Sequence, residues 1–139
     1  MGYAATCSLH AAEFTGTSAE VVKLCGRDRG LFAIVGLGDA DAVKLATDLA
    51  AGNGRILVHG IALTDASLEA ARRGIGAAGV AGFASAEKLA LSPIPYRDNV
   101  VNVMVVPDLE AAEAAGFSQA DALKAVAPLG KLCVRIGGN

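Results

Sequence analysis

Short apolar stretches typical of β-strands alternate along this chain with amphipathic stretches typical of α-helices. Residues 31–35 (LFAIV) form a continuous apolar run between two glycines, as expected of a strand buried on both faces. Further strand-like runs lie at 55–59, 80–84, 100–106 and 131–136. Such alternation is typical of a parallel sheet with helices on both faces and right-handed crossovers. We therefore predict an α/β, Rossmann-like three-layer sandwich with a mainly parallel sheet of about five strands.

The predicted helices have recognisable starts. The segments TSAE at 17–20 and SQAD at 118–121 fit a capping box, in which the first hydroxyl accepts from the amide three residues on. Apolar residues at helical spacing mark two further helices, at 42–49 and 68–78. A length of 139 residues favours one domain. We assign residues 1–16 to an N-terminal extension and 17–139 to the α/β domain.

Composition and charge exclude several classes of function. Twelve Lys and Arg against 14 Asp and Glu give a net charge of −2 without a basic block, which argues against nucleic-acid binding. The sequence has no apolar run of about 18 residues, so we predict no membrane span. The start lacks the features of a signal peptide, so we expect a soluble domain.

The cysteines do not indicate a disulfide framework or a metal site. Cys7, Cys25 and Cys133 are an odd number of widely separated residues, with no CxxC motif and no histidine at metal-ligand spacing. Free Cys is among the most buried residue types and behaves as a small apolar side chain. We therefore expect unreactive thiols.

A glycine-rich turn directly after the first long strand is the candidate ligand site. In open α/β sheets, ligands bind beyond the carboxyl ends of the strands, and here that position reads Gly36-Leu37-Gly38-Asp39-Ala40-Asp41. Two carboxylates at one helix start are unfavourable beside a pyrophosphate, so the turn fits a dinucleotide poorly. A cationic or neutral ligand suits it better, and S-adenosylmethionine carries sulfonium and ammonium groups.

Several segments resemble class I S-adenosylmethionine-dependent methyltransferases, in the family's order. These are the turn at 31–40, LVHGIA and DASLEAAR within 57–72, SAEKL at 85–89, PYRDNVVNV at 95–103 and LKAVAPLGKL at 123–132. The sequences of these segments most resemble a methyltransferase-like domain that accompanies PQQ-type β-propeller repeats in large bacterial proteins. The resemblance spans residues 18–136 and implies a sheet truncated relative to the seven strands of that fold.

The chain departs from the family at the positions that hold the cofactor. An acid usually binds the ribose at the end of strand two, and another meets the adenine after strand three; Ala62 and Ser85 or Ala86 stand there. Losing such charge-assisted bonds removes about 1.5–3 kcal/mol each, so we expect weak or absent cofactor binding. The cofactor-binding positions that the resemblance implies are Gly36, Leu37, Gly38, Asp39, Ala62, Leu63, Ser85, Ala86 and Asp108, with no catalytic and no metal-ligating residue.

Some of these residues also have a structural interpretation. Asp39 suits a cofactor loop and a helix N-terminus equally well, and Asp108 could orient a nucleophile or cap the helix that follows it. His59 fits a packed core histidine better than a catalytic base. Asn102, inside an apolar strand, needs a buried hydrogen-bond partner.

Two hypotheses about function stay open. The first is an S-adenosylmethionine-binding, methyltransferase-like domain whose catalytic activity is doubtful. The second is a degenerate, non-catalytic scaffold or accessory domain of a larger protein. Its partner would be a neighbouring propeller domain or, through an open sheet edge, a second copy. NAD-linked oxidoreduction is disfavoured by Asp41 and Ala62.

Overall fold

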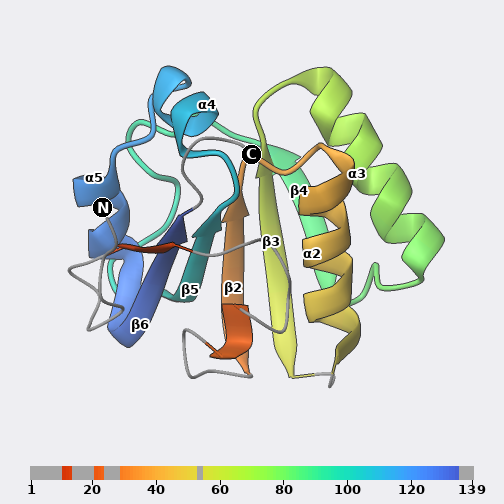
Figure 1. Cartoon of the computed structure of the whole chain (residues 1–139), viewed down its shortest axis with the longest axis horizontal. Coiled ribbons are helices and arrows are strands. Elements are labelled where there is room, and N and C mark those ends of the chain that lie inside the picture. Colours follow the sequence, from red (N-terminus) through yellow and green to blue (C-terminus); the bar gives the residue numbers. More distant parts are fainter. Residues whose placement is uncertain (1–10, 14–20, 24–28, 53–54, 135–139) are drawn as a thin grey trace.

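The computed structural model describes residues 11–13, 21–23, 29–52 and 55–134. They form a six-stranded sheet of order β1-β6-β5-β2-β3-β4, in which every paired strand is parallel (Figure 1). The strands are β1 Ala11–Glu13, β2 Gly30–Val35, β3 Ile56–Ala62, β4 Ala84–Lys88, β5 Val101–Val106 and β6 Val126–Val134. The helices that follow β2, β3, β5 and α4 are α2 Ala40–Gly52, α3 Asp65–Ala78, α4 Leu109–Ala114 and α5 Gln119–Ala125.

This architecture confirms the predicted α/β, Rossmann-like class, with one strand more than expected. The extra strand is β1, which pairs with the outer side of β6 and lies in the segment assigned to an extension. Its three residues, AAE, contain no apolar run, so the sequence pattern had no signal for it. The predicted capping box at 17–20 lies outside the described residues.

Two predicted strand positions were wrong. The strand expected at 80–84 begins at Ala84, because the chain first turns, with the amides of Phe83 and Ala84 donating to the Val80 carbonyl at 2.8 and 2.9 Å. The last strand begins at Val126 instead of residue 131, since Val126 already pairs with Val101 and the register then shifts.

Helices cover both faces of the sheet, but not evenly. On one face α2 and α3 bury β2, β3 and β4, through residues such as Leu45 and Ile75. On the other face α4, α5 and the helix-free connection at 89–100 bury mainly β5, β6 and β2 (Figure 1). None of the described helices covers this face of β3 and β4 near their amino ends, where Leu57 and Phe83 are 54% and 44% exposed. Parallel sheets are normally covered on both sides, which makes this open face notable.

Side-chain hydrogen bonds fix the element ends. Thr64 Oγ1 accepts from Ser67 N at 3.1 Å and Ser118 Oγ from Asp121 N at 3.3 Å, so both act as N-caps. Asn102 Oδ1 accepts from Leu31 N at 2.9 Å, which supplies the partner that its place in an apolar strand requires. Cys133 is buried in β6. None of the helices described is long and apolar enough to cross a membrane.

Candidate functional site

The carboxyl ends of the strands bring the predicted ligand residues to one edge of the sheet. From β2 the chain proceeds in one direction to β3 and β4, and later in the other to β5 and β6. The order therefore reverses between β2 and β5, which is where open α/β sheets bind ligands. At this edge lie the turn at 36–39 after β2, Leu63 after β3, residues 89–91 after β4 and Asp108 after β5.

The turn after β2 is held against β3 by its backbone. Gly36 has a φ of +95°, a conformation that glycine adopts without strain. The amides of Gly36 and Leu37 both donate to the Ile61 carbonyl, at 2.8 and 2.9 Å. The Leu37 side chain is 1% exposed and packs where Gly60 has no side chain. Leu37 is therefore a core residue, and only its backbone is available to a ligand.

Gly38 is also explained by packing within the chain. A Cβ placed on Gly38 would lie 2.4 Å from Ser67 Cβ and 3.0 Å from Ser67 Cα. The first distance is too short for real atoms and the second is tight, so glycine allows the first turn of α3 to approach the loop this closely.

Two carboxylates at this edge, those of Asp39 and Asp108, cap helices. Asp39 Oδ1 accepts from Ala42 N at 2.8 Å, at the start of α2, and Asp108 Oδ1 accepts from Ala111 N at 3.1 Å, at the start of α4. This confirms the structural interpretation of each. A carboxylate has further acceptor capacity, so neither cap by itself prevents a contact with a ligand.

A hollow of about 450 Å³ lies beside the turn. Leu63 connects the two, because its Cδ1 lies 3.9 Å from the place where a Cβ of Gly36 would be, and it also lines the hollow. The side chains around it are apolar apart from one lysine, and polar atoms also contribute to its surface. The residues that line it are Leu63, Lys88, Leu89, Ala90, Leu91 and Ala115. Its volume is within the usual range of small-ligand pockets.

The edge offers no carboxylate at the end of β3. Ala62 ends that strand, as predicted, and is fully buried. The exposed acid that follows in sequence is Asp65, whose Oδ1 lies 3.2 Å from Lys88 Nζ at the mouth of the hollow. The described residues contain no cluster of three potential metal ligands.

Ser85 and Ala86 do not lie where they were predicted. Both are inside β4, paired with His59 and Gly60, instead of after the strand. Ala86 is buried under α3, whereas Ser85 points to the open face. The register is displaced because the strand begins at Ala84. Residues 89–91 take the place at the edge that had been assigned to these two.

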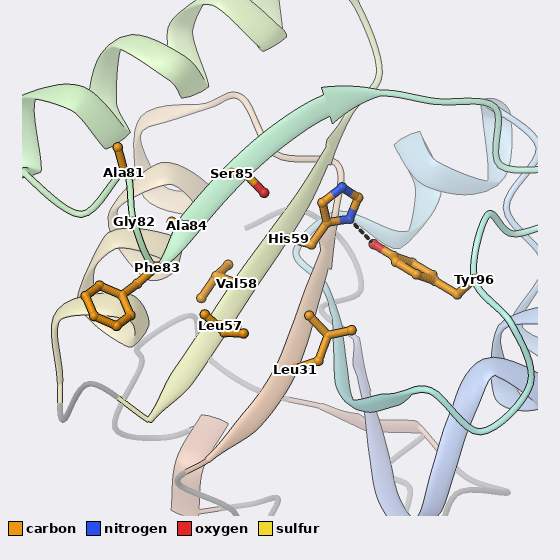
Figure 2. A pocket seen from close by; sticks show the side chains of 10 residues that line it. All are labelled: Leu31, Leu57, Val58, His59, Ala81, Gly82, Phe83, Ala84, Ser85 and Tyr96. Carbon is orange, nitrogen blue, oxygen red and sulfur yellow. Dashed lines mark hydrogen bonds between the residues drawn. The ribbon is translucent and has the colours of Figure 1, made fainter.

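A second hollow, of about 400 Å³, lies on the open face of β3 and β4 and was not predicted from the sequence (Figure 2). His59 and Tyr96 meet there with their rings at an 86° angle and Tyr96 Oη 2.6 Å from His59 Nδ1. His59 Nε2 lies 2.7 Å from Glu87 Oε1. These residues come from β3, β4 and the connection at 89–100, so no sequence spacing indicates the cluster.

The Tyr96 hydroxyl stays protonated over the whole physiological range. Burial raises its pKa well above the ordinary value for tyrosine, and the negative charge of Glu87 raises it further. With a neutral imidazole, Tyr96 O–H donates to Nδ1 and Nε2–H donates to Glu87. Both ring nitrogens of His59 and the Tyr96 hydroxyl proton then have hydrogen-bond partners.

The sheet order is that of a doubly wound, Rossmann-like α/β fold, and solved structures of methyltransferases superpose on it. A protein of Methanococcus maripaludis assigned as an S-adenosylmethionine-dependent methyltransferase superposes with a TM-score of 0.68 at 16% identity, over 88% of this chain and 55% of its own. A SAM-dependent methyltransferase of Aquifex aeolicus gives 0.60 at 16%, over 80% and 58%. The [4+2]-cyclase SpnF gives 0.61 at 19%, over 80% and 40%.

These likenesses show the fold and leave the activity open. The chain spans only about half the length of the structures that it matches. One of the three is named as a cyclase, so the same fold hosts more than one chemistry. No protein-family model matches the chain, and no curated protein matches it.

Proposed function

We propose that this chain is a methyltransferase-like domain that binds S-adenosylmethionine weakly at the carboxyl edge of β2, β3 and β4. The observation that carries the proposal is the shared wall at Leu63, which joins the turn at 36–39 to the apolar hollow. The hollow is suited to the adenine ring, and the second oxygen of the exposed Asp39 to a cationic group of the ligand. When bound, the ligand supplies an electrophilic methyl group.

The affinity is limited by the groups that would hold the ribose. Ala62 has no hydrogen-bonding side chain, and the exposed Asp65 is already ion-paired to Lys88. A charge-assisted hydrogen bond contributes about 1.5–3 kcal/mol, which corresponds to roughly a 10- to 150-fold weaker dissociation constant. We therefore place binding in the high-micromolar to millimolar range.

Calorimetric titration with S-adenosylmethionine and S-adenosylhomocysteine tests the proposal. Ala90→Trp fills the hollow from an exposed position, and Ala77→Trp adds the same bulk at the exposed far end of α3. We expect binding to survive Ala77→Trp and to disappear with Ala90→Trp. Absence of heat at millimolar ligand, or equal binding to both variants, refutes the proposal.

A non-catalytic role is the second candidate, and it is favoured because carboxylates at the edge serve as helix caps. Asp39 and Asp108 cap helices, and the position of the ribose acid is a buried alanine. In this alternative the domain is an accessory part of a larger protein, with the propeller repeats suggested by the sequence resemblance as its neighbour. Methyl transfer by the isolated chain would overturn it. Failure of both ligands to bind, in a folded chain, would support it.

A further inference from the structure

The hollow on the open face of β3 and β4 lies away from the proposed cofactor edge and has a different character. Its apolar part consists of Leu31, Leu57 and Phe83, near the amino ends of the three strands. Its polar part consists of Ser85, His59 and Tyr96, and Figure 2 shows His59 and Tyr96 meeting at one side. An apolar pocket with a few converging polar groups is the usual form of a small-molecule site.

The polar end offers an acceptor, and a negative charge lies just beyond it. With a neutral imidazole, Tyr96 donates its proton to His59 Nδ1, which leaves the phenol oxygen with a lone pair to accept a further bond. Glu87 binds His59 Nε2 through one oxygen and is 55% exposed. None of the ten described residues that line the hollow is a lysine, arginine, aspartate or glutamate, and Glu87 is connected to it through His59.

We propose that this hollow binds a small organic amine with an aromatic or apolar body, its ammonium group at the His59–Tyr96 end, where Glu87 contributes a negative charge from beyond His59. The ring would lie on Leu31, Leu57 and Phe83, which removes apolar surface from water on both sides. The ammonium donates to the free lone pairs and lies near the only carboxylate attached to the cluster. A volume of about 400 Å³ accommodates such a molecule.

Three probes of equal shape separate charge from simple apolar binding. Phenethylamine, 2-phenylethanol and 3-phenylpropionate share a ring and a short chain, and carry a positive, a neutral and a negative group. We would titrate each into the ¹⁵N-labelled chain and follow its amide resonances. For phenethylamine we expect a dissociation constant of the order of 1 mM, with shifts concentrated at Phe83, Ser85 and His59. The propionate should bind least.

Two variants assign the site, and a third serves as control. Glu87→Gln keeps an oxygen for His59 Nε2 but removes the charge, and should weaken phenethylamine about threefold to fivefold without affecting 2-phenylethanol. Ser85→Leu fills the hollow and should abolish binding of all three probes. Glu110→Gln, on exposed α4, should have no effect.

Several outcomes would overturn the assignment. One is binding of 3-phenylpropionate as tight as that of phenethylamine, and another is an unchanged amine affinity in Glu87→Gln. Resonance shifts confined to other parts of the chain, or no shift at about ten times the expected dissociation constant, would also refute it. Binding of S-adenosylhomocysteine at the other edge is measured separately, so a failure of one site is distinguishable from a failure of the other.

Discussion

Gly60 allows the most direct test of how the ligand turn is held against the sheet. A Cβ at position 60 would lie 2.1 Å from Leu37 Cδ2 and 3.2 Å from Leu37 Cβ. Carbon atoms in contact are normally about 3.5–4.0 Å apart. Leu37 is 1% exposed, so its side chain has no solvent into which it can turn. The substitution Gly60→Ala must therefore displace Leu37 or the strand itself.

The expected magnitude follows from overpacking. Inserting a methyl group into a filled core costs about 1–3 kcal/mol, and the smaller entropy of alanine in the unfolded chain returns about 0.4–1 kcal/mol. We expect Gly60→Ala to lower the free energy of unfolding by about 1–2 kcal/mol on this balance. Leu37→Ala alone leaves a cavity and should cost about 2–5 kcal/mol.

The double variant distinguishes a steric clash from a general weakness of glycine substitutions. In Gly60→Ala/Leu37→Ala the new methyl group occupies part of the space left by leucine, so the loss should be smaller than the two single losses added together, by about 1 kcal/mol or more. Urea unfolding followed by circular dichroism measures all three. Gly76→Ala in α3 meets nothing within 4 Å and should be stabilising, as a matched control.

Two results would refute this reasoning. The first is a Gly60→Ala variant as stable as the original chain, since Leu37 would then have room to move. The second is additivity of the two single substitutions within about 0.5 kcal/mol, which is the behaviour of sites that do not touch.

Four further expectations rest on single contacts. Asn102→Ala should cost about 1–3 kcal/mol in urea unfolding, because the amide of Leu31 loses its acceptor, whereas Asn102→Asp should cost less. Thr64→Ala removes the α3 cap and should cost about 1 kcal/mol in the same assay. Leu57→Lys, on the open face, should change stability by less than about 0.5 kcal/mol. Because the pKa of Tyr96 is raised in the folded chain, the tyrosinate absorbance near pH 10 should be the same in the chain, which has two tyrosines, and in Tyr96→Phe. Stability should fall as the pH rises above about 10, and should fall less in Tyr96→Phe.

The sequence pattern predicted the elements whose two faces are buried or whose ends carry caps. The run at 31–35 became the central strand β2, and the Ser118 cap starts α5. The edge strand β4 was misplaced because only Ala84 and Ala86 are buried along it, so it carries no apolar run. The strand was predicted instead at residues 80–84, an apolar stretch just before it.

The cluster on the open face was beyond the reach of sequence patterns for a different reason. His59 and Tyr96 are 37 residues apart, and their contact depends on the path of a connection that forms no helix. That path is in turn fixed by long-range contacts, such as the amide of Ile94 donating to Asp121 Oδ2 at 2.7 Å. No periodicity reports contacts of this kind, so His59 could be read only as a core residue.

The glycines of the ligand turn cannot decide between a binding domain and a scaffold. Gly36 has a φ of +95°, and Gly38 leaves room for Ser67, which the chain packs where a side chain would otherwise lie. A glycine motif of this form is therefore needed for folding whether or not a ligand ever binds. Substituting Gly38 would abolish binding and destabilise the fold together, and its result would support either hypothesis. Ala90→Trp is the informative change, because it closes the hollow from an exposed position that the core does not need.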